Sequence, residues 1–336
     1  MSNWKGKHGP LLIAEIGGNH EGDFEYAKKL TQLAIDTNVD FIKFQIYTGD
    51  TLVSSIEGAV RNKHFKKFEL SKEQHIELAQ LCQTNGIGYM ASVWDLEVIE
   101  WIDQYLPIYK IGSGDLTAYP VLEKIALIGK PIILSTGLAS MNEVEEAVAF
   151  IRSINSIYND SEYLALLQCT SMYPIPYSDA NLHVMESFKS IGAAVGYSDH
   201  TQGNLGLNTS VAMGAEILEF HFTDSREGKE FRDHKISLTP QEVALLIGDI
   251  QKINDLKGSA EKTLLPIEIE HDHHTSFRRA VYPIKDIQAG ETLSRDNLTV
   301  LRPNHGIDAR DFNKVVGKKA TMGFKKHQKL DWNLLE

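Results

Sequence analysis

The sequence has few cysteines, only Cys82 and Cys169 in 336 residues, and both fall inside segments that we predict to be regular secondary structure. Two isolated cysteines argue against a disulfide framework or a zinc ribbon. The chain also lacks any run approaching the roughly 20 apolar residues of a membrane span, and its first ten residues lack the apolar core of a signal peptide. We therefore expect a cytoplasmic protein that is not a membrane protein.

Basic residues are also fewer than acidic ones. The chain has 34 Lys and Arg against 45 Asp and Glu, a formal net charge of -11. Nucleic acid is held mainly by clustered basic side chains, so this balance argues against a general nucleic-acid surface. It says nothing about a small pocket, and a basic site for a small anion remains compatible with it.

Short apolar runs alternate with amphipathic stretches along the first 255 residues, as expected for parallel strands covered by helices. The runs are 11–17, 41–46, 88–93, 108–113, 131–136, 163–169, 193–198 and 216–222, and helical patterns include 25–37, 71–85, 141–154 and 239–253. Eight strand–helix units predict a (β/α)8 TIM barrel. The alternative, a doubly wound open sheet, would favour a G-x-G-x-x-G turn after an early strand, and the glycines here do not fit that spacing.

The alternating pattern of apolar runs and amphipathic stretches ends near residue 258. Residues 259–278 are polar and without a single period, which predicts a linker. Residues 279–336 contain short strand-like segments and turn signals, which predict a small β-rich domain. A core that small is marginal by itself, so we expect this domain to dock against a barrel. The predicted division is thus a catalytic barrel at 1–258, the linker, and the small domain.

Polar side chains stand where the predicted strands end, which is where barrel enzymes build their sites. The first strand ends in Glu15, and the last carries Glu219 and His221. The strands and turns between them supply Lys43, Gln45, Ser92, Lys110, Ser113, Asp115, Ser135, Ser171, Tyr173 and His200. Burying such groups unpaired costs free energy, so a ring of them indicates a site.

The residue types in this ring suggest its ligands. Lys43 and Lys110 can hold a phosphate and a carboxylate through charge-assisted hydrogen bonds, helped by the hydroxyls of Ser92, Ser113 and Ser135. His200 and His221, which end adjacent strands, can converge on one divalent ion, and manganese suits two imidazoles with nearby carboxylates. A purely structural interpretation also exists, because a single strand-end histidine is commonly structural and Lys43 could simply pair with Glu15.

Seven segments resemble the sialic acid synthase family and cover nearly the whole predicted barrel in order. They are I-A-E-I-G-G-N-H-E-G (13–22), I-K-F-Q (42–45), Y-K-I-G-S-G-D (109–115), P-I-I-L-S-T-G (131–137), Q-C-T-S-M-Y-P (168–174), G-Y-S-D-H (196–200) and L-E-F-H-F-T (218–223). The tail resembles the family's C-terminal antifreeze-like (SAF) domain, including L-R-P-N-H-G (301–306).

The resemblance implies a metal-dependent transferase that condenses phosphoenolpyruvate with N-acetylmannosamine or a related amino sugar. Phosphate is released, and the product is a nine-carbon 2-keto-3-deoxy sugar acid. The metal is usually Mn²⁺, with Mg²⁺ or Co²⁺ as alternatives, and His200 and His221 resemble its ligands. The implied phosphoenolpyruvate contacts are Lys43, Ser92, Lys110, Ser113, Ser135, Ser171 and Tyr173.

The family pattern also implies the remaining roles. Glu15 and Gln45 line the site, Glu15 or Asp115 carries a proton, and Asp233 faces the hydroxyls of the sugar. Arg302 matches an arginine that the tail domain lends to the neighbouring subunit, which implies a domain-swapped homodimer.

The chain departs from the common family pattern at Asp115, Ser171, Phe220 and the segment S-V-W-D (92–95). The last two leave the acceptor sugar open. Alternatives are a pseudaminic or legionaminic acid synthase, or a synthase that requires a 6-phosphorylated sugar. More distant ones are a metal-dependent barrel aldolase or epimerase without phosphoenolpyruvate, and a carbohydrate- or ice-binding module suggested by the tail.

Overall fold

The computed structural model describes residues 2–336. The chain divides into two compact units at the boundary between Gly258 and Ser259. The first unit is built around eight parallel strands. They are β2 (Gly9–Glu15), β3 (Phe41–Ile46), β4 (Gly88–Val93), β5 (Tyr109–Ile111), β6 (Ile132–Ser135), β7 (Leu164–Cys169), β8 (Ala194–Asp199) and β9 (Ile217–His221). Each pairs with the next, and β9 pairs with β2, which closes the ring. The predicted (β/α)8 barrel is confirmed.

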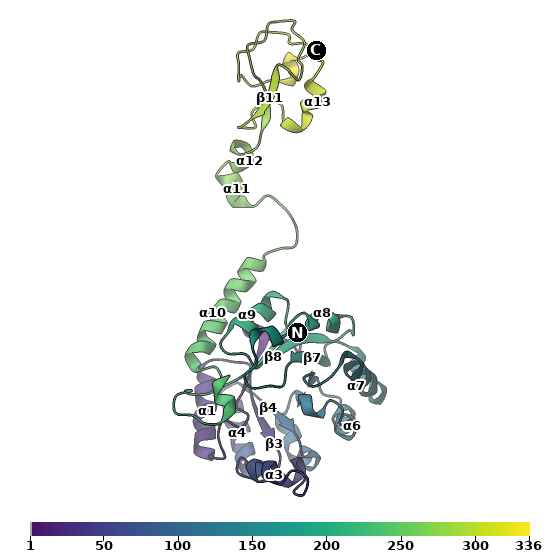
Figure 1. Cartoon of the computed structure of the whole chain (residues 1–336), viewed down its shortest axis with the longest axis vertical. Coiled ribbons are helices and arrows are strands. Elements are labelled where there is room, and N and C mark those ends of the chain that lie inside the picture. The colour runs from purple at the N-terminus through teal and green to yellow at the C-terminus, as the bar shows by residue number, and fades with distance from the viewer. Residues whose placement is uncertain (1) are drawn as a thin grey trace. The chain divides into compact units, whose positions relative to one another are not determined.

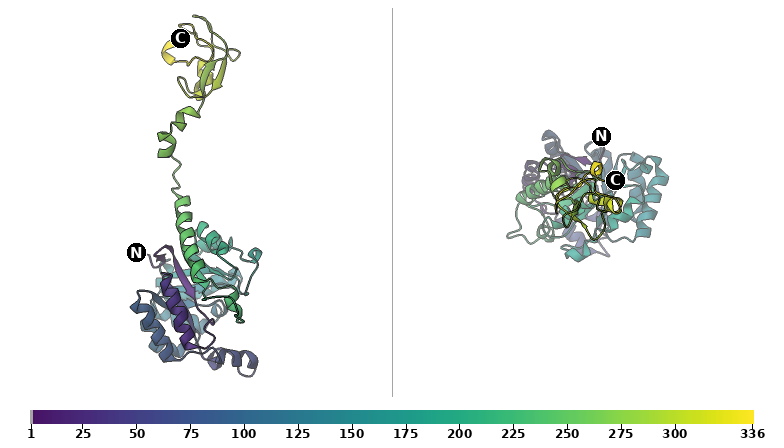
Figure 2. Two further views of the ribbon diagram at one scale, coloured as in Figure 1. Left: turned by 90° about the vertical axis from the view of Figure 1, so that its left-hand side faces the viewer. Right: turned by 90° about the horizontal axis from the view of Figure 1, so that it is seen from above.

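Helices cover the outside of the ring. The main ones are α1 (Phe24–Asp36), α4 (Lys72–Thr84), α6 (Tyr119–Ile128), α7 (Met141–Ile154), α8 (Val184–Lys189), α9 (Leu205–Ala212) and α10 (Pro240–Lys257). The first and last of these, α1 and α10, lie side by side where the ring closes (Figures 1 and 2). The short helices α2 (Gly49–Leu52) and α3 (Ala59–Lys66) are inserted after β3, and α5 (Ile99–Ile102) follows β4.

Local sequence sets the helix starts. Ser71 Oγ accepts a hydrogen bond from the backbone N–H of Gln74, and Gln74 Oε1 accepts one from the backbone N–H of Ser71. Two backbone donors at the start of α4 are thereby satisfied. The same reciprocal arrangement begins α7 at Ser140 and α10 at Thr239.

The barrel unit has two hydrophobic layers. The larger lies between strands and helices, and the smaller fills the inside of the ring with Leu11, Ile13, Met90, Ile133 and others. Trp4, just before the two-residue strand β1 (Lys5–Gly6), belongs to the inner layer, and its indole N–H donates to the carbonyl of Ser161. Burying each large side chain of this kind contributes roughly 1.5–3 kcal/mol. The interior is a packed core rather than a pore.

The second unit has a core of its own. The antiparallel pair β10 (Ala280–Pro283) and β11 (Leu298–Leu301) packs with α13 (Phe312–Val315), and Val281, Leu293, Phe324 and Leu330 fill the centre. Two short helices, α11 (Pro266–Glu270) and α12 (His273–Ser276), lie in the segment expected to be an irregular linker. Within residues 2–336, no helix combines the length and apolarity that crossing a bilayer takes.

Candidate active site

A change from apolar to polar side chains marks the carboxyl end of the barrel. The site residue on each of six strands follows an inner-core residue by two positions, so both face the barrel axis. The pairs are Ile13 and Glu15, Phe41 and Lys43, Met90 and Ser92, Ile108 and Lys110, Ile133 and Ser135, and Ile217 and Glu219. The strand register places Glu15 beside both Lys43 and His221, and Ser92 beside both Gln45 and Lys110. Residues far apart in the sequence thus meet in one layer.

Four charged side chains form a buried cluster in this layer. Lys43 Nζ lies 2.7 Å from Glu15 Oε2 and 3.9 Å from Glu219 Oε2, and Lys110 Nζ lies 3.6 Å from the same Glu219 oxygen. All four are at most 7% exposed. Replacing a buried ion cluster with apolar residues is often neutral or stabilising, so its presence is better explained by function than by stability.

Burial and neighbouring charge act differently on the four pKa values. Burial raises the pKa of Glu15 despite the attraction of Lys43. Burial also lowers the pKa of Lys110, whereas for Lys43 it is outweighed by Glu15 and Glu219, so the pKa of Lys43 is raised. Glu219, lying between the two ammonium groups, has a lowered pKa although burial opposes this. Glu219 is therefore the carboxylate that stays ionised between the lysines.

Hydroxyl groups converge beside Lys110. Its Nζ donates to Ser135 Oγ at 2.7 Å, and Ser113 Oγ accepts from the backbone N–H of Gly137 at 3.0 Å. A Cβ at Gly137 would clash with Ser171 Oγ and come within 2.9 Å of Ser113 Oγ, so only glycine leaves this space open. A cavity of about 500 Å³ lined by Thr136, Cys169 and Ser171, among others, adjoins this place. One ammonium, three hydroxyls and a missing Cβ form a polar cradle whose charge and hydrogen-bonding groups suit a phosphate.

Two histidines end β9 and follow β8, with ring centroids 5.3 Å apart. His200 Nδ1 donates to the carbonyl of Thr170 at 2.7 Å, so Nε2 carries the lone pair when the ring is neutral. Burial lowers the pKa of this imidazole, but Cys169 and the Thr170 carbonyl outweigh burial and raise it. His221 Nδ1 is buried without a hydrogen-bond partner within residues 2–336, and burial lowers the pKa of this imidazole. The ring of Tyr173 lies 4.1 Å from His200 and 5.6 Å from His221, between centroids. In the neutral form, each imidazole therefore has a ring nitrogen that a cation could bind.

Asp233 approaches the histidines from the loop between β9 and α10. Its Oδ2 lies 3.7 Å from His221 Nδ1, and burial raises its pKa. The short 3-10 helix Arg232–Lys235 that carries Asp233 is tied to the loop after β2. Asn19 Nδ2 donates to Ser237 Oγ at 2.8 Å, and Ser237 Oγ donates to the Asp233 carbonyl at 2.7 Å. The Asp233 backbone is thus fixed by side chains from both ends of the barrel sequence.

Comparison with known proteins places this architecture in a family. Residues 30–262 match the model of the NeuB family, and residues 278–336 match the model of the SAF domain. The chain belongs to the NeuB family.

The family includes relatives that match most of the chain. It is 35% identical to the N,N'-diacetyllegionaminic acid synthase of Campylobacter jejuni, over 95% of this chain and 98% of the relative. It is 33% identical to the N-acetylneuraminate-9-phosphate synthase of Mus musculus, over 94% and 89%. The crystal structure of N-acetylneuraminic acid (sialic acid) synthetase from Leptospira borgpetersenii is similar with a TM-score of 0.72 and 32% identity, covering 79% of this chain and 90% of that one. The resemblance to sialic acid synthases is confirmed.

Among the predicted site residues of this NeuB-family chain, all those in the barrel unit line its carboxyl end. Gln45 Nε2 donates to Glu15 Oε1 at 2.8 Å, and Lys43 Nζ donates to Ser92 Oγ at 3.3 Å. Asp115 is half-buried, and burial raises its pKa although a hydrogen bond from Trp94 opposes this. Arg302 belongs to the second unit, where its guanidinium lies 5.6 Å from the ring centroid of Phe277.

Two residues of the site were given no role from the sequence. Glu219 was placed on a strand but not assigned, although it stands two positions before His221 and therefore on the same inward face. Asn19 falls in the turn after β2, where only its buried hydrogen bonds to Phe222 and Ser237 reveal its function. Alternation along β9 could have identified Glu219, whereas Asn19 lies in the family-like segment 13–22, which marks the residue but not its hydrogen-bond partners.

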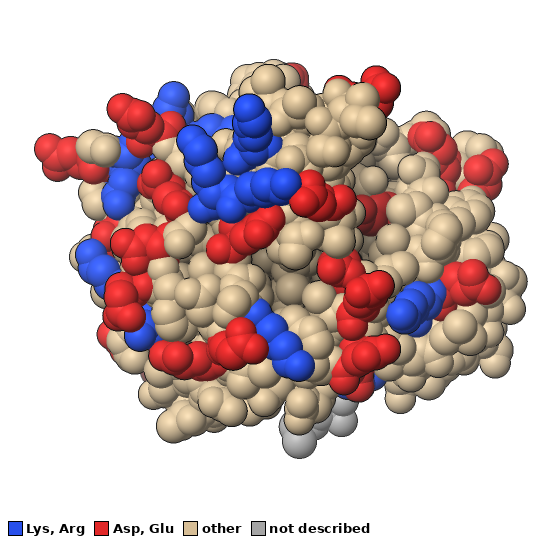
Figure 3. All heavy atoms as spheres, turned by 90° about the horizontal axis from the view of Figure 1, so that it is seen from below, with Lys and Arg blue, Asp and Glu red and all other residues tan. Residues whose placement is uncertain are grey.

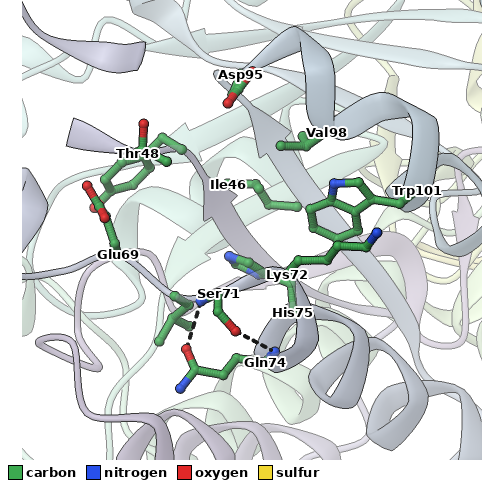
Figure 4. A pocket seen from close by; sticks show the side chains of 12 residues that line it. Ile46, Thr48, Glu69, Ser71, Lys72, Gln74, His75, Asp95, Val98 and Trp101 are labelled. Carbon is green, nitrogen blue, oxygen red and sulfur yellow. Dashed lines mark hydrogen bonds between the residues drawn. The ribbon is translucent and has the colours of Figure 1, made fainter. Parts of the chain in front are cut away.

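The carboxyl-end face is hollowed near its centre. Figure 3 views the barrel unit from the side on which α3 lies, with acidic and basic side chains interspersed around the hollow. A separate cavity of about 450 Å³ lies between the end of β3, the start of α4 and the segment around α5 (Figure 4). Its lining includes Glu69, His75 and Trp101 and contains none of the predicted site residues. The predicted site residues therefore lie outside this cavity.

Proposed function

We propose that this protein condenses phosphoenolpyruvate with an open-chain amino sugar, releasing phosphate and forming a nine-carbon 2-keto-3-deoxy sugar acid. The observation that carries the proposal is the buried Lys43–Glu219–Lys110 cluster, adjoining a hydroxyl cradle on one side and two histidines on the other. A three-carbon phosphate with a carboxylate needs two cationic anchors, and an aldehyde needs polarisation. The two lysines and the two histidines at one barrel mouth support both parts of the proposal.

The lysines and hydroxyls hold phosphoenolpyruvate. Lys110 with Ser113, Ser135 and Ser171 binds the phosphate, and Lys43 with Ser92 binds the carboxylate. Carbon three of the enol forms a bond to the aldehyde carbon, whose oxygen takes up a proton. Water adds at carbon two, and the bond from carbon two to the bridging oxygen then breaks and releases phosphate. Positioning two reactants in this way can lower a barrier by roughly 7–11 kcal/mol.

Glu15 and Asp115 are the two candidates for accepting the proton of the attacking water. Glu15 stands within the cluster, and burial raises its pKa, which brings it nearer to the range useful for proton transfer. Asp115 shares this raised pKa but lies in the turn after β5. Substituting each in turn separates the two roles, because only the proton carrier should shift the acid limb of the pH–rate profile.

His200 and His221 fit a divalent ion, for which we propose Mn²⁺, with Mg²⁺ or Co²⁺ as alternatives. Two observations support the ion. His200 Nδ1 is engaged by the Thr170 carbonyl, so Nε2 is the nitrogen left for a metal, and the buried Nδ1 of His221 has no hydrogen-bond partner within residues 2–336. Residues 2–336 contain no cluster of three or more His, Cys, Asp and Glu side chains suited to an ion, so the protein would supply the two imidazoles. A bound ion would supply Lewis-acid polarisation of a carbonyl oxygen.

We propose N-acetylmannosamine or a related amino sugar as the acceptor, bound through its hydroxyls to Asp233. The named relatives make different sugar acids, so a legionaminic or pseudaminic acid synthase and a synthase of the 9-phosphate are the alternatives. We further propose a domain-swapped homodimer in which Arg302 of one subunit completes the sugar site of the other.

The test is phosphate release with Mn²⁺, phosphoenolpyruvate and a panel of amino sugars, phosphorylated and not. Oxygen-18 in the bridge at carbon two should appear in the released phosphate. Turnover without phosphoenolpyruvate would instead support an aldolase or epimerase, and binding without turnover across the panel would support a carbohydrate-binding module.

The metal proposal has a test of its own. We expect His221→Ala to abolish turnover and to weaken Mn²⁺ binding measured by calorimetry, while circular dichroism shows an unchanged fold. Activity that survives both this substitution and a chelator would contradict the metal site.

A further inference from the structure

Arg232 stands at the rim of the candidate site with most of its guanidinium uncommitted. Its Nε donates to Asp233 Oδ1 at 3.2 Å, and this is the single hydrogen bond the side chain makes within residues 2–336. The carbon of the guanidinium lies 4.6 Å from the ring centroid of Tyr173, and the side chain is 64% exposed. Both terminal nitrogens therefore remain available to a ligand.

Asp233 and Arg232 follow one another in space along a line that leads outward from His221. His221 lies 3.7 Å from one oxygen of Asp233, and Arg232 donates to the other oxygen. Tyr173 packs against His200 and His221 and also under Arg232, so it fixes the direction of the guanidinium. A sugar whose aldehyde points at the histidines passes Asp233 first and reaches Arg232 next.

The two side chains at the rim have opposite hydrogen-bonding capacity. An ionised Asp233 only accepts, so it binds a hydroxyl or amide N–H of the sugar. A guanidinium only donates, in a planar fork, and it pairs best with an oxygen that only accepts. The pair thus suits a sugar that offers a hydrogen-bond donor to Asp233 and an acceptor-only oxygen to Arg232. An ordinary hydroxyl would be a weaker partner for Arg232.

A structural role alone does not explain Arg232. An ion pair with one partner this exposed contributes little to stability, because water screens it and the long side chain must be ordered. A structural clamp would also be expected to use the whole fork on the protein. Here stacking on Tyr173 restricts the side chain while leaving its outer edge unpaired.

We propose that Arg232 is a specificity-determining residue, which binds an acceptor-only oxygen on the far half of the amino sugar. That oxygen is either the carbonyl of a second acylamino group or a phosphate, and plain N-acetylmannosamine provides neither. This assignment rests on the proposed function and deepens it, because it predicts an acceptor with a further substituent.

The test measures kcat/KM for three acceptors with wild-type protein, Arg232→Met and Arg232→Lys. The acceptors are N-acetylmannosamine, its 6-phosphate, and a 2,4-diacetamido-2,4,6-trideoxy hexose. We expect the wild type to prefer one of the two substituted sugars. For that sugar, Arg232→Met should lower kcat/KM roughly 10- to 100-fold, as expected for a lost charge-assisted hydrogen bond. For N-acetylmannosamine, and for the KM of phosphoenolpyruvate, little should change.

The lysine variant distinguishes the two kinds of oxygen. A point charge still attracts a phosphate, so Arg232→Lys should retain much of the activity on the 6-phosphate. It should behave like Arg232→Met on the diacetamido sugar, where the planar fork matters more than the charge. Lys235→Met is the matched control, since Lys235 is exposed on the same 3-10 helix and should alter no acceptor preference.

Three results would overturn the assignment: a wild-type preference for N-acetylmannosamine, an equal loss on all three sugars, or unchanged kinetics in Arg232→Met. An equal loss would mean that Arg232 acts only by positioning Asp233. If wild-type protein releases phosphate with none of the sugars, the proposed function itself fails, and the assignment fails with it.

Discussion

At the scale of single residues, the central feature is a carboxylate shared by two buried lysines. Glu219 Oε2 lies between Lys43 and Lys110, and Ser198 donates to Glu219 Oε1 at 2.9 Å. Without this carboxylate, two ammonium groups would remain in the core with Glu15 as their single counter-charge in the cluster. The cluster would then bind an anion more tightly but would hold the protein together less well.

We expect Glu219→Gln to lower the free energy of unfolding by about 3–5 kcal/mol, as for a broken buried ion pair. Burial already lowers the pKa of Lys110, and loss of Glu219 would lower it further, so turnover should fall at neutral pH. Urea unfolding and steady-state kinetics measure the two effects. Glu216→Gln, an exposed position next to the same strand, should do neither. An unchanged unfolding free energy in Glu219→Gln would show that the lysines do not depend on this carboxylate.

Some residues of the buried cluster could be predicted from the sequence, and others could not. Lys43 and Lys110 stand out because lysine is rare inside an apolar strand, so their inward placement was predictable. The pairing of Lys43 with Glu15 was one of the interpretations open from the sequence, but the sharing of Glu219 by both lysines was not, because it depends on which strands are neighbours and on their stagger. The register that brings Glu219 near both lysines is set by barrel closure, which no local pattern encodes.

At the scale of elements, the sequence predicts the positions of the strands, but not every strand end. The predicted strands 41–46 and 88–93 match β3 and β4, and the helix 141–154 matches α7. The run 108–113 yields only β5 (Tyr109–Ile111), because Gly112 begins a turn into a short 3-10 helix that orients Ser113 and Asp115. The site itself therefore shortens the strand.

Helix α3 shows why some elements have no clear sequence signal. Its residues are polar on most sides, so no apolar stripe marks it. The helix is instead fixed by buried Asn62, whose side-chain amide donates to the carbonyls of Gly49 and Val53. Tertiary hydrogen bonds of this kind cannot be read from periodicity.

The tie between the loops after β2 and β9 gives a prediction at this scale. Ser237→Ala removes the hydroxyl that links Asn19 to the Asp233 backbone, and leaves a buried amide hydrogen of Asn19 unpaired. We expect the KM for the acceptor sugar to rise about tenfold, in line with the roughly 1–3 kcal/mol cost of an unsatisfied buried donor. The KM for phosphoenolpyruvate should stay constant. The exposed Ser190→Ala is the control, and an equal effect on both substrates would contradict a role in positioning Asp233.

At the scale of the whole molecule, buried histidines should make the fold sensitive to acid. His75 lies on the buried face of α4, its Nδ1 is 2.9 Å from the hydroxyl of Tyr89 on β4, and burial lowers its pKa to about 3. An unfolded chain would titrate it near 6.5, so below that pH the unfolded state binds more protons. Stability is therefore present above pH 6.5 and is lost progressively as the pH falls toward 3.

We expect the free energy of unfolding to fall between pH 6.5 and 5 by about 2 kcal/mol through His75 alone, at roughly 1.4 kcal/mol per proton per pH unit. His20, whose pKa burial lowers to about 4, acts in the same direction. His75→Gln should show a slope shallower by about one proton, measured by urea unfolding across this range. Equal slopes in variant and wild type would mean that His75 is protonated in the folded state.

The proposed domain swap makes a prediction that no single chain can satisfy. If Arg302 completes the sugar site of a partner, Asp233→Asn and Arg302→Ala chains should each be inactive alone. A mixed dimer would unite the intact Asp233 of one chain with the intact Arg302 of the other at one of its two sites. Random reassortment of equal amounts, by unfolding and refolding together, should then restore about a quarter of wild-type activity. If Arg302 served the barrel of its own chain, every site in every dimer would carry one defect, and mixing would restore nothing.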